Sequence, residues 1–216
     1  MDLFVKVAAR DSLLSQKQVQ EVLSALQKHH PKVRFINCLM KSRGDLDQAT
    51  SLRSLEKSDF FTKELDEAVL DGSCHIGIHA AKDLPDPLTQ GLSLIALTQG
   101  IDPSDVLVVR DGETIRQKAK IATSSWRRQK TVESLYPTAI CVDIRGTIEQ
   151  RLLLLDQKDV DAVVMAKAAL LRLGLTHRTM IALPGPVAPL QGKLAIVAKV
   201  EDVEMQKLFD CLHRPV

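Results

Sequence analysis

The stretch Ile121–Leu135, IATSSWRRQKTVESL, constrains the fold of this chain most. A short apolar strand is predicted to end at Ala122, and three hydroxyl residues then precede Trp126, Arg127 and Arg128, which begin an amphipathic helix. Hydroxyls at a helix N-terminus accept hydrogen bonds from the free N–H groups there or donate to a ligand. The helix end carries partial positive charge, and the arginines add full charges with forked donors. Positive side chains in the first turn of a helix interact unfavourably with the helix dipole, so we do not expect the paired arginines to stabilise the fold. The combination therefore predicts a carboxylate or phosphate site.

The same order of strand, basic residue, capping hydroxyl and helix occurs twice more. The further copies are Leu3–Ala8 followed by Arg10 and Ser12, and Ile140–Ile144 followed by Arg145, Thr147 and Arg151. Ligands of open α/β sheets lie at the carboxyl ends of strands, so three such sites facing one crevice indicate a ligand with several negative charges. The alternative interpretation is three ordinary helix caps with solvated arginines.

Strands and helices alternate along the chain, which predicts an α/β fold with mostly parallel sheets. The other expected strands are Arg34–Leu39, Ile76–His79, Leu92–Leu97, Val106–Val109, Ala162–Met165 and Leu194–Val200. The expected helices begin at Ser12 and Trp126 and span Phe60–Leu70 with Asp59 as its cap, Ile148–Leu155, Ala166–Leu173 and Asp202–Leu212. Residues 40–59 are polar without periodicity, which predicts a mobile loop of the kind that often serves as a functional lid.

Two turn-rich linkers, near residues 98–104 and 183–192, divide the chain. We expect residues 1–98 plus 193–216 to form lobe one and residues 104–188 to form lobe two, with the last strand and helix on lobe one. Two lobes joined by two crossings predict a ligand cleft between them. A hydrophobic content of 45% supports a substantial core.

Composition excludes several classes of function. Aromatic residues make up only 3% of the chain and the formal net charge is +2, so we expect no nucleic-acid partner. No stretch approaches the ~20 apolar residues of a membrane span, and the N-terminus does not resemble a signal peptide. The four cysteines are far apart and lack metal-ligand spacing, so we expect no metal site. Cys38 and Cys141 lie in apolar runs and are expected to be buried thiols. Free thiols are typical of a reducing compartment, so we expect a cytoplasmic protein. We also expect a monomer.

The segment His79–Pro85, HAAKDLP, places Lys82 and Asp83 just after a predicted strand. A carboxylate at this edge could stabilise a cation that forms during a reaction, or shuttle a proton. The alternative is a surface ion pair of little energetic consequence. We expect His79 to be a packed strand histidine rather than a base.

Five segments together resemble the porphobilinogen deaminase family, also called hydroxymethylbilane synthase, of the tetrapyrrole pathway. They are FFTKELDEAVLDGSCHIGIHAAKDLPDPLTQGLSLIAL, DPSDVLV, IATSSWRRQKTVESLYP, IRGTIEQRLLLLDQKDVDAVVMAKAALLRLGL and QGKLAI, in family order across nearly all 216 residues. The resemblance implies two lobes of the periplasmic-binding-protein (type II) kind with an interdomain cleft, and a third small domain. It also implies an enzyme that removes ammonia from porphobilinogen and couples four pyrroles, primed by a dipyrromethane cofactor on a cysteine.

The resemblance also implies residue roles, because pyrrole units carry acetate and propionate arms. Asp83 would be the catalytic group, stabilising the positive charge that develops as ammonia leaves. The implied cofactor-binding residues are Lys82, Ser125, Arg127, Arg128 and Phe61. The implied substrate-binding residues are Arg10, Ser12, Gln18, Arg145 and Arg151. Residues 40–59 would correspond to the family's flexible active-site loop.

The chain departs from the family at the cofactor cysteine, which lies in the third domain. This sequence stops at Val216, before that domain should begin, and Cys211 is not in a matching segment. We therefore expect no covalently bound dipyrromethane on this chain, and weak or primer-dependent turnover. Three interpretations remain open: a reduced porphobilinogen deaminase, a non-catalytic binder of pyrrole polycarboxylates, and a generic two-lobe binding protein for small anions.

Overall fold

The computed structural model describes residues 2–55 and 58–214, without the side chain of Ser54. The chain divides into two compact units, each built around its own five-stranded sheet. Unit 1 comprises Met1–Leu46, Lys57–Ile101 and Gly192–Val216, and unit 2 comprises Asp47–Glu56 and Asp102–Gln191. The described residues 47–55 group with unit 2 by their contacts, whereas the sequence analysis grouped them with lobe one.

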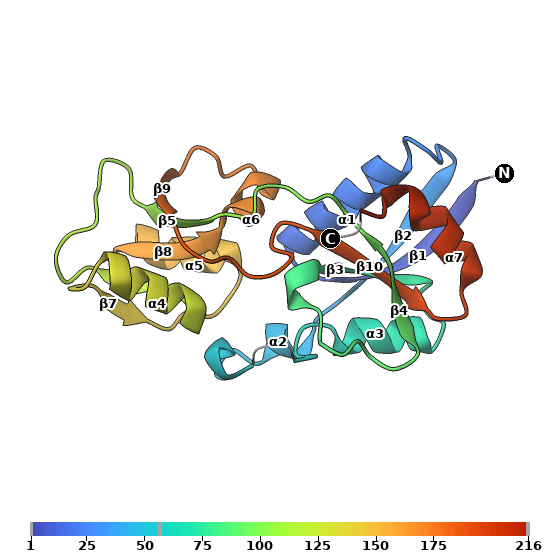
Figure 1. Cartoon of the computed structure of the whole chain (residues 1–216), viewed down its shortest axis with the longest axis horizontal. Helices are drawn as coiled ribbons and strands as arrows, with labels where there is room; N and C mark the ends of the chain where they lie inside the picture. Colours follow the sequence, from blue (N-terminus) through green and yellow to red (C-terminus); the bar gives the residue numbers. More distant parts are fainter. Residues whose placement is uncertain (1, 56–57, 215–216) are drawn as a thin grey trace. The chain divides into compact units, whose positions relative to one another are not determined.

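The sheet of unit 1 has the strand order β2-β1-β3-β10-β4. Its strands are β1 (Leu3–Arg10), β2 (Val33–Met40), β3 (Ile76–Ala80), β4 (Leu92–Leu97) and β10 (Leu194–Lys199). Helices α1 (Leu13–Leu26) and α7 (Val203–Phe209) cover one face, and α3 (Lys63–Leu70) covers the other (Figure 1). Alternation along β1 explains the two layers, because Val5 and Val7 pack under α1 whereas Ala8 packs under α3.

The sheet of unit 2 has the strand order β7-β6-β8-β5-β9. Its strands are β5 (Asp105–Val109), β6 (Lys120–Ala122), β7 (Ile140–Val142), β8 (Ala162–Ala166) and β9 (Thr179–Leu183). Helices α5 (Ile148–Asp156) and α6 (Lys167–Arg172) pack on one face, and α4 (Trp126–Leu135) packs on the other. The central strands are buried on both faces, as the continuous apolar run of β8 requires.

Both sheets are mixed rather than mostly parallel. In unit 1, β10 runs antiparallel to β3 and β4, and in unit 2, β5 runs antiparallel to β8 and β9. Each of these strands starts beside the carboxyl end of a parallel strand, as the bonds from the Ala81 N–H to the Lys193 carbonyl and from the Lys167 N–H to the Ser104 carbonyl show. A strand that enters at this edge must run back against its neighbour.

Local differences from the predicted elements have local causes. Helix α3 begins at Lys63 rather than Phe60, and Asp59 contributes its carbonyl to a preceding turn instead of a side-chain cap. Strand β7 ends at Val142, two residues early. Strand β9 was not predicted at all, because it adjoins a proline-rich segment.

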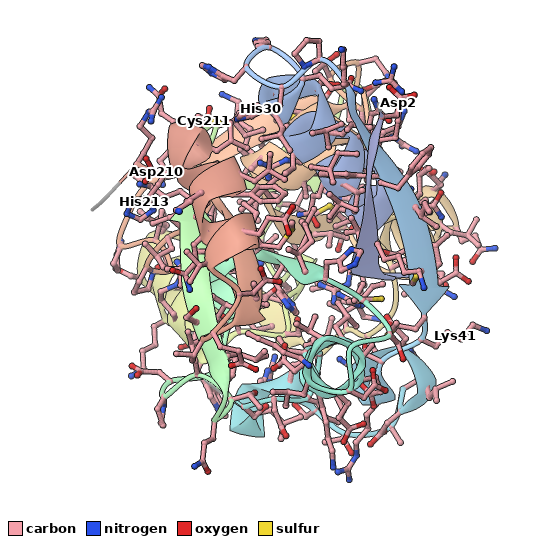
Figure 2. All side chains as sticks on the ribbon, turned by 90° about the vertical axis from the view of Figure 1, so that its right-hand side faces the viewer. Asp2, His30, Lys41, Asp210, Cys211 and His213 are labelled. Carbon is pink, nitrogen blue, oxygen red and sulfur yellow. The ribbon has the colours of Figure 1, made fainter. Side chains whose placement is uncertain are left out.

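The predicted loop 40–59 is not devoid of structure. It contains the short helix α2 (Arg43–Leu46) and the single turn η1 (Leu52–Ser54). The turn η3 (Asp210–Leu212) follows α7, and His213 comes directly after it (Figure 2). The Leu97 N–H donates to the His213 ring. None of the helices in the described residues is long and apolar enough to cross a bilayer.

Candidate functional site

Arg10 ends β1 of unit 1 and faces a carboxylate that sequence analysis did not identify. Its Nε donates to Asp45 Oδ2 over 3.1 Å, and its Nη2 contacts Asp45 Oδ1. The guanidinium lies 4.6 Å from the centre of the Phe61 ring, a cation–π distance. Burial raises the pKa of Asp45, but hydrogen bonds from Arg10 and Ser42 and the charge of Arg10 outweigh it, so the net pKa is lowered. Arg10 is thus held in a fixed orientation by groups on both sides.

A small cavity of about 50 Å³ in unit 1 brings five of the predicted site residues together. The predicted residues that line it are Arg10, Ser12, Gln18, Phe61 and Asp83. Asp83 ends the turn η2 (Ala81–Asp83), which follows β3 directly, and Lys82 is half-buried in the same turn. Ser12 caps α1 by accepting from the Ser15 N–H, as predicted.

His79 forms the inner wall of this cavity and is 5% exposed, which confirms that it is a packed strand histidine. Its Nε2 lies 3.4 Å from Asp66 Oδ1, and the Thr89 hydroxyl donates to Asp66 Oδ2 over 2.6 Å. Asp66 was missed, although a carboxylate on the apolar stripe of a helix, beside Leu65 and Val69, is the available signal. The network supports the cavity floor from α3.

In unit 2, Ser125 caps α4 by accepting from the Arg128 N–H. Both arginines of that first turn contact Asp105, the first residue of β5. Arg128 Nη2 and Nε lie 2.6 and 3.1 Å from Asp105 Oδ1, and Arg127 Nη2 lies 2.8 Å from Oδ2. The amide of Gln191 also donates to Asp105 Oδ1. We expected the arginine pair to have no structural role in the fold. That expectation was wrong, because the buried Asp105 carboxylate binds both arginines.

Asp105 is 2% exposed, so its charge must be compensated within the protein. Burial raises the pKa of Asp105. The charge of Arg128 and the hydrogen bonds from Arg128, Arg127 and Gln191 lower it by more than burial raises it, so the net pKa is below its usual range. Two guanidiniums share one carboxylate, so the cluster keeps an excess positive charge. The signal that could have identified Asp105 is a charged residue directly before a continuous apolar strand.

The third predicted motif joins the second at one edge of the unit 2 sheet, because β6 and β7 are parallel neighbours. Arg151 Nη1 lies 3.4 Å from the Ser124 hydroxyl oxygen, and its Nε donates to the Gly146 carbonyl. Arg145 Nη2 donates to the Asp47 carbonyl over 2.5 Å. Thr147 caps α5 in a reciprocal capping box with Gln150. Two helix N-termini and several arginines thus lie at this edge. Both kinds of group bind carboxylates.

The cysteines differ from expectation. Cys38 and Cys141 are half-buried, whereas Cys74 is the buried one. Burial, together with the neighbouring Cys38 thiol, raises the pKa of Cys74 to about 12. Burial also raises the pKa of Cys141 and of Cys211, which lies between Asp210 and His213 beyond α7 (Figure 2). No group of three or more His, Cys, Asp and Glu side chains in the described part of the chain could hold a metal ion.

Comparisons with known proteins agree on one family. A family model described as "Porphobilinogen deaminase, dipyromethane cofactor binding domain" matches residues 5–207. The chain is 42% identical over 208 residues to a probable porphobilinogen deaminase of Chlamydia muridarum, covering 95% of this chain and 85% of that protein. It is 35% identical over 221 residues to porphobilinogen deaminase of Synechococcus elongatus, covering 98% of this chain and 69% of that protein.

Solved structures that resemble this one share the fold at low sequence identity. The probable amino-acid ABC transporter extracellular-binding protein ytmK of Bacillus subtilis has a TM-score of 0.57 at 12% identity, covering 98% of this chain and 91% of that one. The periplasmic VFT2 domain of Bordetella pertussis BvgS has a TM-score of 0.55 at 14% identity, covering 97% and 86%. These likenesses confirm a periplasmic-binding-protein (type II) fold.

Proposed function

Since the chain belongs to the porphobilinogen deaminase family, we propose that it is a hydroxymethylbilane synthase, which deaminates porphobilinogen and joins the pyrroles into a linear tetrapyrrole. The family match spans residues 5–207, and relatives with this name cover nearly the whole chain. One structural observation carries the proposal furthest. Asp83, the expected catalytic group, lines one cavity with Arg10, Gln18 and Phe61.

Arg10 and the cluster at α4 and α5 suit the carboxylate arms of a pyrrole. Arg10 is oriented by Asp45 and Phe61, so little side-chain freedom is lost when a carboxylate binds. In unit 2, Arg145 and Arg151 lie at the edge where the N-termini of both helices also attract anions. Asp105 compensates only part of the positive charge of Arg127 and Arg128. The remaining positive charge would attract the carboxylate arms.

Asp83 acts electrostatically in this proposal. Loss of ammonia from the aminomethyl group of porphobilinogen leaves a positive charge that spreads over the pyrrole ring, and the Asp83 carboxylate stabilises it. The carboxylate also accepts a hydrogen bond from the pyrrole N–H. The cavity beside Asp83 is lined by polar side chains such as Ser12 and Gln18, which suit the aminomethyl group of the substrate.

Dipyrromethane is the cofactor that the family implies, and the donor set in unit 2 fits its carboxylate arms. Ser125, Arg127 and Arg128 would hold those arms. Lys82 and Phe61 keep the cofactor-binding roles that the family resemblance implies. When bound, the cofactor supplies the pyrrole end to which substrate units are joined. Three of the described thiols fit a thioether poorly, because a thiolate must form and burial raises the pKa of Cys74, Cys141 and Cys211. The fourth, Cys38, lies within strand β2 and is half-buried. We infer non-covalent retention by this chain.

We infer a monomer in the cytoplasm without a nucleic-acid partner. Four free cysteines suit a reducing compartment, and the near-balanced charge gives no broad basic footprint. Sedimentation would test the oligomeric state, and co-purification would test for a nucleic-acid partner.

The test of the proposed function is turnover of porphobilinogen by the purified chain. Ammonia release and tetrapyrrole formation should both occur, and added dipyrromethane primer should raise the rate. Intact mass under denaturing conditions should equal that of the unmodified chain. Binding of porphobilinogen without ammonia release, with or without primer, would instead indicate a non-catalytic binder. A dipyrromethane-mass adduct lost in one Cys→Ser variant would refute non-covalent retention.

A further inference from the structure

A groove of about 1110 Å³ lies in unit 2. Of the residues assigned to the reaction, it contains only Arg127. Its lining residues are Arg53, Trp126, Arg127, Lys130, Thr131, Ser134, Leu135, Pro184, Gly185 and Pro186. One wall is α4 and the other is the segment 184–186 that follows β9. We propose that this groove binds an oligopyrrole chain through its flat rings and its carboxylate arms.

The wall formed by α4 presents two adjacent rows of side chains. Residues four apart lie on the same side of a helix, so Trp126, Lys130 and Ser134 form one row. Arg127, Thr131 and Leu135 form the next. The α4 wall thus presents cations beside apolar and hydroxyl groups. Such a surface suits a ligand with an apolar body and charged arms.

The opposite wall is fixed close to α4. Arg127 Nη1 donates to the Pro186 carbonyl. Gly185 has φ of +140°, and a side chain on it would meet Thr131 within 3.1–3.3 Å, so glycine allows the close approach. The groove is therefore a formed feature of unit 2.

Trp126 gives the groove an aromatic surface. Its side chain is 47% exposed, which is unusual for the largest apolar residue. The Arg53 guanidinium lies 5.1 Å from the ring centre, and Arg53 Nη2 donates to the Thr123 carbonyl over 3.0 Å. Arg53 is thus held at the mouth beside the ring, where stacking and charge act on one ligand.

The charge of the groove is positive. Three of its lining side chains are cations, and none of the described residues that line it is acidic. Arg127 shares Asp105, and Arg53 Nε lies 3.8 Å from Asp143. Lys130 is exposed and makes no ion pair with any described carboxylate, so its charge remains for a ligand.

The volume favours an extended ligand over a single small molecule. Sites for drug-sized ligands usually have roughly 300–1,000 Å³, so this groove exceeds the needs of one pyrrole. The class of ligand, several linked pyrroles with acetate and propionate arms, rests on the proposed function. The groove would hold linked pyrroles of a growing chain or of the product.

Trp126 is the sole tryptophan of the chain, so its fluorescence reports on this groove. The probe is uroporphyrin I, a stable tetrapyrrole with acetate and propionate arms, and affinities are checked by calorimetry. We expect saturable quenching of Trp126, and about tenfold weaker binding in Lys130→Glu, because one charge-assisted contact is replaced by repulsion. Lys207→Glu, an equal charge change on exposed α7, is the control and should bind as the wild type does.

Three results would overturn the proposal: no quenching, equal affinities of Lys130→Glu and Lys207→Glu, or equal quenching by inorganic polyphosphate, which would show a non-selective cationic surface. Binding is measured without turnover, so the two claims separate. Groove binding without ammonia release would refute only the proposed function. Ammonia release without groove binding would refute only the groove.

Discussion

At the scale of single residues, three of the predicted site arginines, Arg10, Arg127 and Arg128, are positioned by carboxylates rather than left to solvent. Asp45 binds Arg10, and Asp105 binds Arg127 and Arg128. Both acids have lowered pKa values because the arginine contacts outweigh burial, so they remain charged at neutral pH. A site for anions built in this way keeps its donors oriented and retains excess positive charge in unit 2.

Asp105→Asn should destabilise unit 2 strongly. The substitution leaves Arg128, which is 8% exposed, without its buried counter-charge, and breaking such a pair costs about 3–5 kcal/mol. Urea unfolding measures the loss. The matched control is Asp156→Asn, which breaks the more exposed Arg178 pair and should cost less than about 1 kcal/mol. Equal losses in the two variants would show that Asp105 is not the organising charge.

At the scale of elements, short segments outside the regular strands and helices position the site. Helix α2 brings Asp45 to Arg10, and Gly44 in the same turn lies against Phe61. A side chain at Gly44 would overlap the Phe61 ring, which in turn lies under Arg10. The segment predicted as a loop thus determines where an arginine of the site points.

Gly44→Ala should therefore lower stability by about 1–3 kcal/mol through overpacking, and weaken porphobilinogen binding by moving Phe61 and Arg10. Adding Phe61→Leu should recover most of the lost stability, because the smaller side chain makes room. A double-mutant cycle by urea unfolding measures this coupling. If the two substitutions are simply additive, Gly44 and Phe61 are not in the contact described.

Sequence analysis located most elements because their signals are local. Hydroxyl caps at Ser12, Ser125 and Thr147 mark three helix starts, and all three form the expected bonds. The direction of β10 depends on contacts between residues distant in the chain. A local pattern can mark Asp105 as a charged residue before an apolar strand, but it does not record that Asp105 pairs with Arg128. For the same reason, several residues that line the cavity could be anticipated, but not the contact of Asp66 on α3 with the lining residue His79.

At the scale of the whole molecule, the structure predicts loss of stability in acid. Asp45, Asp102 and Asp105 all have lowered pKa values, with Asp102 at about 2 because of hydrogen bonds from Lys167 and Ser104. Unfolded aspartates titrate near ~3.9, so these groups contribute full stability above about pH 4. That contribution is lost as the pH falls through the folded pKa values, which for Asp102 means toward about 2.

Urea unfolding from about pH 5 to about pH 2.5 measures this dependence. The free energy of unfolding should fall across the range, and the fall should be smaller in Asp102→Asn, which cannot titrate at that position. A free energy that is constant over the range, or an unchanged slope in the variant, would contradict the assigned ion pairs.

The central claim is that Asp83 stabilises the cation formed when porphobilinogen loses ammonia. The most direct measurement is ammonia release by Asp83→Asn, which keeps the size of the side chain and removes its charge. We predict a rate lower by a factor on the order of 10²–10³, with the far-UV spectrum and urea midpoint unchanged. Asp71→Asn, an exposed residue at the end of α3, should release ammonia at the wild-type rate. A wild-type rate in Asp83→Asn would contradict the claim.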